Sequence, residues 1–155
     1  MSAAVAVLLI VGLGGYASGA ADDREQQAEV IRADIVGRAT MVNEGMVQEL
    51  IDAWAEDGIR MAPNKSPIVG IDSLARATTA SFDRFEFRNR VHDVQEVQVF
   101  GDWAFSWGYC SDERVPRAGG DTRPYYGKYL VILKRQPDGR WLKYIDATND
   151  EPAPQ

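Results

Sequence analysis

The sequence contains almost no cysteine or histidine. Cys110 is the one cysteine and His92 the one histidine in 155 residues. An intrachain disulfide is therefore impossible, and a catalytic histidine pair or a zinc site built from several His and Cys ligands is excluded. We predict a protein that works without a metal or another cofactor. Cys110 alternates with small residues and has no cation beside it, which indicates a buried, inert thiol.

Basic residues are in the minority, and nowhere do they form a run. The chain has 17 Lys and Arg against 23 Asp and Glu, for a formal net charge of −6. Nucleic-acid binding depends on basic side chains that neutralise phosphates, so we predict no nucleic-acid partner. The length of 155 residues and the hydrophobic content of 45% fit one domain with one core.

The N-terminus lacks charge altogether from Ala3 to Tyr16, and the small residues Ala17–Ala21 then give way to Asp22. This order is typical of a signal peptide, so we predict that residues 1–21 are removed and the protein is exported to the periplasm or beyond. The apolar run is shorter than the ~20 residues of a membrane-spanning helix, and we expect no stable span after processing. The alternative is a buried N-terminal helix, since no Lys or Arg precedes the run.

The mature domain, residues 22–150, starts with helical patterns. Apolar spacing predicts helices over residues 23–38 and 43–57, the second capped by Asn43 and ended by Asp57-Gly58. A short strand over 59–62 precedes a proline-rich loop, and Ile68–Val69 is expected to pair back onto that strand. A third helix should follow Gly70 and end by residues 81–83. The tail, residues 151–155, is expected to be disordered.

Alternation with a period of two then predicts four long strands, over residues 85–99, 103–113, 125–135 and 140–148. Regular alternation in the first places His92 with Arg88 and Arg90 on a wetter, solvated face. In the last it groups Asp146 with Tyr144 and puts Lys143 on the opposite face. Three helices followed by a meander indicate an α+β fold, with the helices packed on one face of a strongly curved antiparallel sheet. Such a cone leaves an apolar hollow.

Several short segments together resemble the SnoaL-like branch of the nuclear transport factor 2-like superfamily, over about residues 24–150. The segments are Asp57-Gly58, Met61–Asn64, Pro67–Gly70, Gly101–Ala104, Gly127–Arg135, Asp138–Trp141, Asp146 and Asn149. That superfamily includes ketosteroid isomerases, polyketide cyclases, dehydratases and members without catalytic activity. The resemblance therefore implies a cone-shaped fold but leaves the chemistry open. The dehydratase-type members use pocket histidines, and the sequence departs from them here.

The resemblance implies a cavity in which Asp146 acts as a general base, with Tyr144 or Tyr129 donating a hydrogen bond to a ligand oxygen. A structural hydrogen bond is the alternative for Asp146, and core packing is the alternative for the tyrosines. Other expected pocket residues are Trp54, Asp57, Met61, Asn64, Tyr109 and Lys128. Turn and loop chemistry would explain Asp57 and Asn64 equally well.

The alternation in residues 103–109 places Trp103, Phe105, Trp107 and Tyr109 on one face of their strand. Facing inward they would shape the pocket, and facing outward they would form an interface. The resemblance implies a homodimer formed through the back of the sheet. We expect an exported protein that binds a small apolar or aromatic ligand, with isomerase-type or cyclase-type proton transfer as its activity. The alternative is a non-catalytic, dimeric assembly module.

Overall fold

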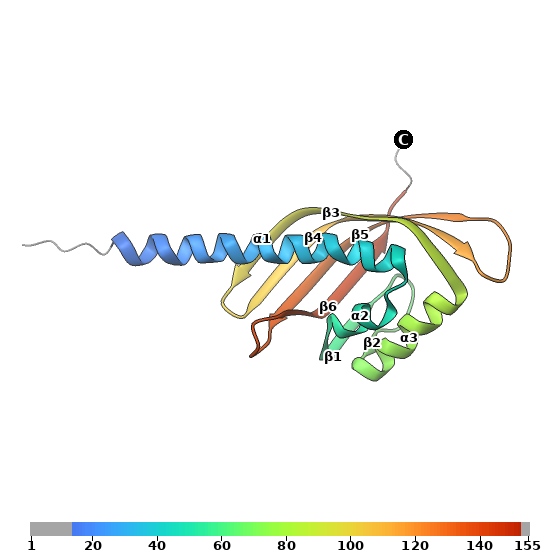
Figure 1. Cartoon of the computed structure of the whole chain (residues 1–155), viewed down its shortest axis with the longest axis horizontal. Helices are drawn as coiled ribbons and strands as arrows, with labels where there is room; N and C mark the ends of the chain where they lie inside the picture. The colour runs from blue at the N-terminus through green and yellow to red at the C-terminus, as the bar shows by residue number, and fades with distance from the viewer. Residues whose placement is uncertain (1–13, 153–155) are drawn as a thin grey trace, which may run out of the picture.

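The computed structural model describes residues 14–152, with side chains from residue 21. Within this range lie α1 (Gly14–Glu44), α2 (Val47–Asp52), β1 (Trp54–Met61), β2 (Ile68–Val69), α3 (Ile71–Arg84), β3 (Phe85–Phe100), β4 (Trp103–Pro116), β5 (Arg123–Arg135) and β6 (Trp141–Asp150). The strands form one curved, open sheet in the order β2-β1-β6-β5-β4-β3, and the helices lie against its concave face (Figure 1). The expected α+β cone is confirmed.

The sheet is mixed, so the expectation of a wholly antiparallel sheet is wrong at one pairing. Strand β1 runs parallel to β6, with Arg60 opposite Asp146, whereas the other neighbouring pairs are antiparallel. A parallel pair needs a long connection. Here α3 and the meander β3–β5 supply it, and Arg60 is thereby placed beside the C-terminal strand.

Helix α1 is one continuous rod over 31 residues. Ile31 and Ile35 are buried, as their spacing predicts, but the predicted end near Gly37 is wrong. The helix passes through Gly37 and stops before Gly45, whose φ of 68° suits a left-handed C-terminal residue. A glycine inside a helix costs about 1 kcal/mol, which burial of the following turn offsets.

The start of α1 falls within the predicted signal peptide. Residues 14–21 belong to the helix, and residues 1–13 lie outside the described residues. Export therefore stays a prediction. Among the residues that the structure describes, no helix has both the length and the apolar character to cross a membrane.

The second helix is much shorter than predicted, because α2 ends at Asp52 and Trp54 already begins β1. Trp54 is buried, and its ring leaves only 2.9 Å to where a Cβ of Gly58 would stand. Packing of the indole over that glycine, rather than local helical spacing, decides the conformation here. The pairing of Ile59 with Val69 and the third helix after Gly70 are confirmed.

Two irregularities interrupt the alternation of β3. The register shifts between Arg88 and Val91 and again between Val94 and Glu96, and Asn89 has a φ of 53°. Each bulge moves the following side chains to the opposite face. As a result β3 presents Phe87, His92 and Val99 to the same concave side.

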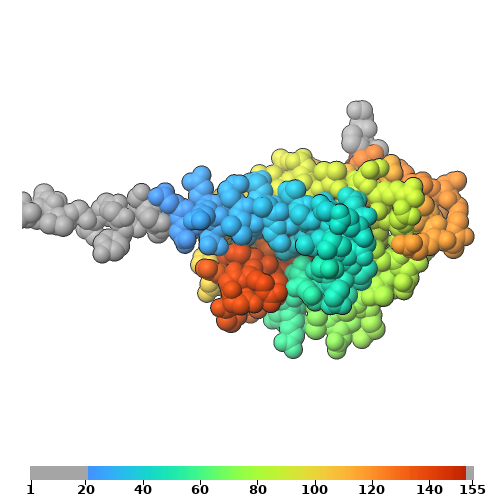
Figure 2. All heavy atoms as spheres, viewed as in Figure 1, coloured from blue at the N-terminus to red at the C-terminus, as the bar shows by residue number. Residues whose placement is uncertain are grey.

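The core lies where α1 crosses the concave face of the meander. Its buried residues are Ile31, Ile35, Val99, Ala104, Cys110, Tyr129, Val131, Leu133 and Trp141. Trp141 donates a hydrogen bond from Nε1 to Gln27 of α1 over 3.1 Å. In the space-filling view α1, in blue, lies directly against the C-terminal strand, in red (Figure 2). The opposite end of the cone is not filled in this way, and a cavity occupies it.

Candidate functional site

A cavity of about 430 Å³ lies between the concave face of the sheet and the helices α1, α2 and α3. Its apolar wall includes Ile35, Leu50, Trp54, Phe82 and Phe87. Volumes of about 300–1,000 Å³ are typical of sites for small organic molecules. The cavity is therefore large enough for a ligand.

The polar part of the wall is mainly basic, which the sequence did not predict. Six basic residues line the cavity: Arg38, Arg60, Lys65, Arg90, Arg114 and Lys143. Three acidic residues, Asp112, Asp146 and Asp150, stand against them. Since the whole chain carries a formal net charge of −6, this cavity has the opposite sign to the rest of the molecule.

Lys143 and Asp146 face each other inside the cavity. Lys143 Nζ lies 3.6 Å from Asp146 Oδ2, and the two side chains are 13% and 22% exposed. The register of β6 against β5 shifts at Tyr144, because Ile132 pairs with Ile145 whereas Leu133 pairs with Lys143. This bulge brings Lys143 to the face of Asp146, so the prediction that they lie on opposite faces is wrong.

The ammonium group of Lys143 is poorly accommodated in its charged form. Burial lowers its pKa from the usual 10.5 to about 7, and the nearby Arg38 and Arg60 add to this, whereas Asp146 acts in the other direction. The amine also lies 3.9 Å from the centre of the Trp54 ring. Near neutral pH a large share of Lys143 is therefore a free amine.

Two tyrosines of β5 lie across glycines of the sheet. A Cβ at Gly108 would come within 2.9 Å of the Tyr129 hydroxyl, and a Cβ at Gly127 within 2.4 Å of that of Tyr125. Both rings line the cavity. Burial raises the pKa of Tyr129, whereas the contact of its buried hydroxyl with Ser106 acts in the other direction.

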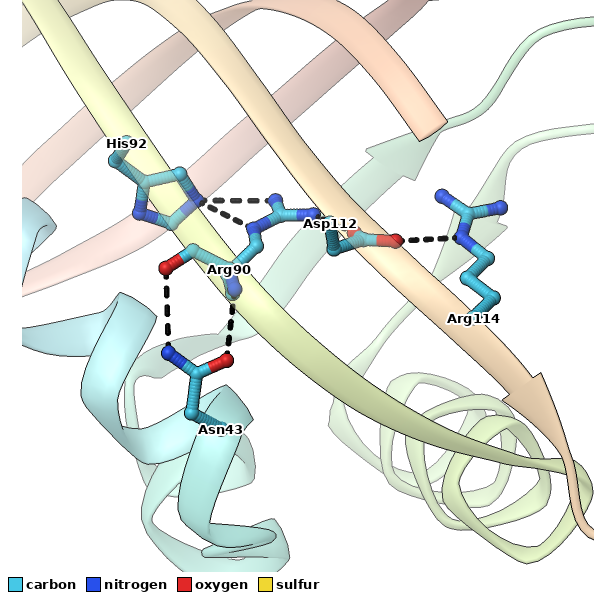
Figure 3. A network of polar contacts seen from close by, with 5 residues as sticks. All are labelled: Asn43, Arg90, His92, Asp112 and Arg114. Carbon is cyan, nitrogen blue, oxygen red and sulfur yellow. Dashed lines mark hydrogen bonds and ion pairs between the residues drawn. The ribbon is translucent and has the colours of Figure 1, made fainter. Parts of the chain in front are cut away.

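A network of hydrogen-bonded polar side chains connects the elements of the cavity wall (Figure 3). The Asp112 carboxylate is fully buried and accepts hydrogen bonds from Arg90 and, over 3.0 Å, from Arg114. At the end of α1 the Asn43 side chain bonds both the backbone N–H and the C=O of Arg90, over 2.7 and 3.2 Å. Helix α1, β3 and β4 are therefore fixed to one another beside the cavity.

His92 belongs to this network, so its predicted position on a solvated face is wrong. Its Nδ1 lies 2.8 Å from the carbonyl oxygen of Ile35, which can only accept, and its Nε2 accepts from Arg90 over 3.0 Å. Burial, and then the charge of Arg90, lower the pKa of His92 to about 4. At neutral pH the ring is uncharged and both nitrogens are engaged, so His92 has no free nitrogen to act as a base.

The structure brings three predicted site residues to the cavity: Asp146, Tyr129 and Trp54. Tyr144 is on the convex face, where its ring packs at 5.3 Å from that of Trp103. Lys128 pairs there with Glu151 of the tail. Three others are exposed and do not line the cavity: Asp57, Met61 and Asn64.

Tyr109 also leaves the expected pocket, because it is 46% exposed on the convex face and borders a separate hollow of about 350 Å³. The same face carries Trp103 and Trp107, exposed by 41% and 39%. The aromatic row therefore faces outward. Cys110, which follows Tyr109 in β4, is buried, and burial raises the pKa of its thiol, as expected of an inert cysteine.

Sequence reasoning missed the basic residues of the cavity. Arg38 ends the first predicted helix and was given no role, and Lys143 was assigned to the wrong face of a strand. Arg38 is 5% exposed, and its Nε has no hydrogen-bond partner in the described part of the chain. The charged residues of β1 and β6 did not indicate a shared site in the sequence, because the parallel pairing of these two strands was not predicted. Between residues 14 and 152 no cluster of three or more His, Cys, Asp or Glu could hold a metal.

Comparison with protein-family models and with curated proteins found no significant match for the sequence. Solved structures do match. A ketosteroid isomerase-like protein from Erwinia carotovora atroseptica shares 25% identity and a TM-score of 0.73, over 81% of this chain and 98% of that one. A conserved protein from Planctomyces limnophilus is 19% identical, with a TM-score of 0.74. The match covers 83% of this chain and 100% of that one.

An NTF2-like protein with a cystatin-like fold from Novosphingobium aromaticivorans extends the match to 92% of this chain and 94% of its own, with a TM-score of 0.66 and 18% identity. The likeness thus includes the helices as well as the whole meander. Similarity at this level concerns the architecture, and the cavity must be interpreted from its own residues.

Proposed function

We propose, since this chain belongs by its fold to the nuclear transport factor 2-like superfamily, that it binds an organic anion with an apolar or aromatic body in its cavity. The main observation that supports this proposal is the excess of basic over acidic residues on the cavity wall of an acidic protein. Arginine side chains bind carboxylates through paired hydrogen bonds. The aromatic wall supplies contact area for the rest of the ligand.

Arg60 and Lys65 are the basic groups best placed for this role. Neither forms an ion pair with another described residue, whereas Arg90 and Arg114 are engaged by Asp112. Arg60 is half-buried and Lys65 exposed, so an anion can approach both from solvent.

We further propose proton transfer at the bound ligand, with Asp146 as the general base. The carboxylate lines the cavity beside Lys143, whose charge state changes near neutral pH. Chemistry of this kind agrees with the name of the ketosteroid isomerase-like neighbour. An Asp146→Asn variant should keep ligand binding and lose catalysed exchange of the α-protons of a simple keto acid in D₂O, followed by NMR. Unchanged exchange would contradict this role.

Binding is tested with benzoate, benzyl alcohol and benzylamine, which share a ring and differ in charge. Isothermal titration should give benzoate at least about tenfold tighter binding than the other two, because one charge-assisted hydrogen bond contributes about 1.5–3 kcal/mol. Arg60→Met should remove this preference, and Lys128→Met on the convex face should retain it. Equal affinity for the three compounds would overturn the choice of an anion.

The second candidate function is assembly through the convex face, and the outward aromatic row favours it. Trp103, Trp107, Tyr109 and Leu130 are each about two-fifths exposed on neighbouring strands. Aromatic side chains grouped in this way are typical of interfaces. We propose a homodimer formed by this face, for which light scattering should give twice the mass of the monomer.

Export remains a proposal, supported by the uncharged N-terminal run and the small residues that follow it. Sequencing the N-terminus of the mature protein from the producing cell tests it. A mature chain that begins near Asp22 supports export, and one that still begins at Met1 opposes it.

A further inference from the structure

Lys143 differs from the other lysines of the chain in its position. The sequence contains four, and Lys65 and Lys128 are exposed while Lys134 lies over the ring of Trp103 on the convex face. Lys65 lines the cavity from an exposed position, whereas the Lys143 side chain lines it and is only 13% exposed. An amine in this position meets whatever ligand the cavity holds.

The amine is held in place without being tightly bound. Its distance of 3.6 Å from Asp146 Oδ2 exceeds the usual range of a hydrogen bond to a carboxylate, and its other neighbour is the indole face of Trp54. The nitrogen therefore keeps the freedom to react.

The surroundings also supply the right protonation state. A lysine needs its free amine form to act as a nucleophile, and desolvation near other cations provides this form in enzymes. Burial together with Arg38 and Arg60 lowers the pKa of Lys143 to about 7. At pH 7 the free fraction is then about three orders of magnitude larger than for a lysine of ordinary pKa.

We propose that Lys143 is a nucleophile that forms an imine with an aldehyde or keto group of an oxo acid bound in the cavity. This inference rests on the proposed binding of an organic anion, because Arg60 would hold the carboxylate while Lys143 attacks the carbonyl carbon. It adds covalent catalysis to a site otherwise assigned to proton transfer.

The reaction balances without a further reagent. The lone pair of Lys143 Nζ adds to the carbonyl carbon, and Asp146 passes the first proton that the nitrogen loses to the carbonyl oxygen, which gives a carbinolamine. Asp146 then accepts the second proton from the nitrogen and passes it to the hydroxyl group, which leaves as water when the C=N bond forms. Addition of water reverses each step and releases the free lysine.

The imine is detected by reducing it in place. The protein is incubated at pH 7 with glyoxylate and sodium cyanoborohydride, whose hydride converts the imine to a stable secondary amine, and the modified peptides are identified by mass spectrometry. Lys143 should gain a carboxymethyl group at least about tenfold faster than any other lysine, in line with its larger fraction of free amine. The slower lysines on the convex face serve as internal controls.

Acetaldehyde, which has no carboxylate, separates this inference from the proposed function. Faster trapping of glyoxylate than of acetaldehyde at Lys143 supports both. Equal selective trapping of the two supports the imine and contradicts the anion preference. If Lys143 is not trapped selectively but benzoate still binds, only the imine is overturned. If neither selective trapping nor benzoate binding is observed, the imine and the anion-binding proposal are both overturned.

The decisive measurement is the trapping at Lys143 in the unaltered chain, and variants serve as additional controls. Lys143→Arg keeps a positive charge and cannot form an imine, so selective trapping should disappear. Lys128→Arg, on the convex face, should trap glyoxylate at Lys143 at the rate of the unaltered chain. Selective modification that persists in Lys143→Arg at another residue contradicts the inference.

Discussion

The two faces of the meander are built from the same strands and have opposite character. On β4 the concave face carries Ala104, Ser106 and Gly108, whereas the convex face carries Trp103 and Trp107. Small residues inside let Tyr129 lie across the sheet and leave room for a cavity. Large aromatic residues outside are left to solvent or to a partner. The difference shows that the hollow depends on which face receives the small residues.

The faces also treat charge differently. Inside, Asp112 is fully buried and is compensated by Arg90 and Arg114. Outside, Lys128 and Glu151 form a pair that remains half in solvent. Buried charges are strongly destabilising once a partner is lost, and exposed pairs contribute little. Stability should therefore depend on the concave network and hardly at all on the convex pair.

The largest effect is expected from Asp112→Ala, which leaves two guanidinium groups beside the cavity without their shared carboxylate. The variant should lose about 3–5 kcal/mol of the free energy of unfolding, measured by urea denaturation. Glu151→Ala removes an acidic partner on the convex face and serves as the control. Equal losses for the two variants would show that the faces do not differ in this respect.

A smaller effect concerns Lys143 above neutral pH. Its pKa of about 7 in the folded chain lies below the 10.5 of the unfolded chain, so the unfolded state binds more protons between these values. Stability should thus rise with pH across this window, by up to about 1.4 kcal/mol per unit, or about 2 kcal/mol between pH 7 and 9. The groups that face the amine are Asp146, Arg38 and Arg60.

This rise is measured as the difference between the unaltered chain and Lys143→Met. Any stability advantage of Lys143→Met over the unaltered chain should shrink or reverse as the pH increases from 7 to 9. Lys134→Met is the matched loss of a lysine from the convex face. A difference that does not change with pH would mean that Lys143 is not desolvated as the structure shows.

The third effect concerns His92 in acid. Its pKa of about 4 in the folded chain lies below the usual 6.5, so stability is fully present above pH 6.5 and is lost as the pH falls toward 4. The loss should reach just under about 2 kcal/mol by pH 5.2. His92→Gln should be less sensitive to pH between 6.5 and 5.2, followed by denaturant titration. An identical slope for both proteins would oppose a buried, neutral His92.

The smallest effect on the folded domain is expected from Leu130→Glu on the convex face. Its side chain is 45% exposed, so the free energy of unfolding of the monomer should change by no more than about 0.5 kcal/mol. If the face forms a dimer, light scattering should nevertheless show a shift to monomer. Benzoate affinity should not change, and a large loss of affinity would mean that the two faces are coupled.

Much of the architecture was predictable because periodicity is a local property. The helical spacing of Ile31 and Ile35, the pairing of Ile59 with Val69 and the long strands of the meander were predicted and are present. The faces of individual side chains were less predictable. Bulges at Asn89 and Tyr144 reverse the alternation, and no local pattern marks them.

The candidate site suffered most from this limit. Asp146, Tyr129 and Trp54 line the cavity, but Lys143 and His92 were assigned to the wrong face because regular alternation was assumed. One residue of slip in a strand exchanges its two faces. The basic character of the cavity depends on such slips, and it could not be predicted from composition.

By itself the sequence determined the layers of this protein, since burial of apolar stripes at periods of 3.6 and 2 leaves few ways to combine helices and strands. It also limited the chemistry, because one histidine and one cysteine exclude many sites. Only the tertiary structure decided which charges share the cavity. Residues such as Arg38, Arg60 and Lys143 are far apart in the chain, and the parallel pairing and the bulges that gather them arise from packing between distant segments.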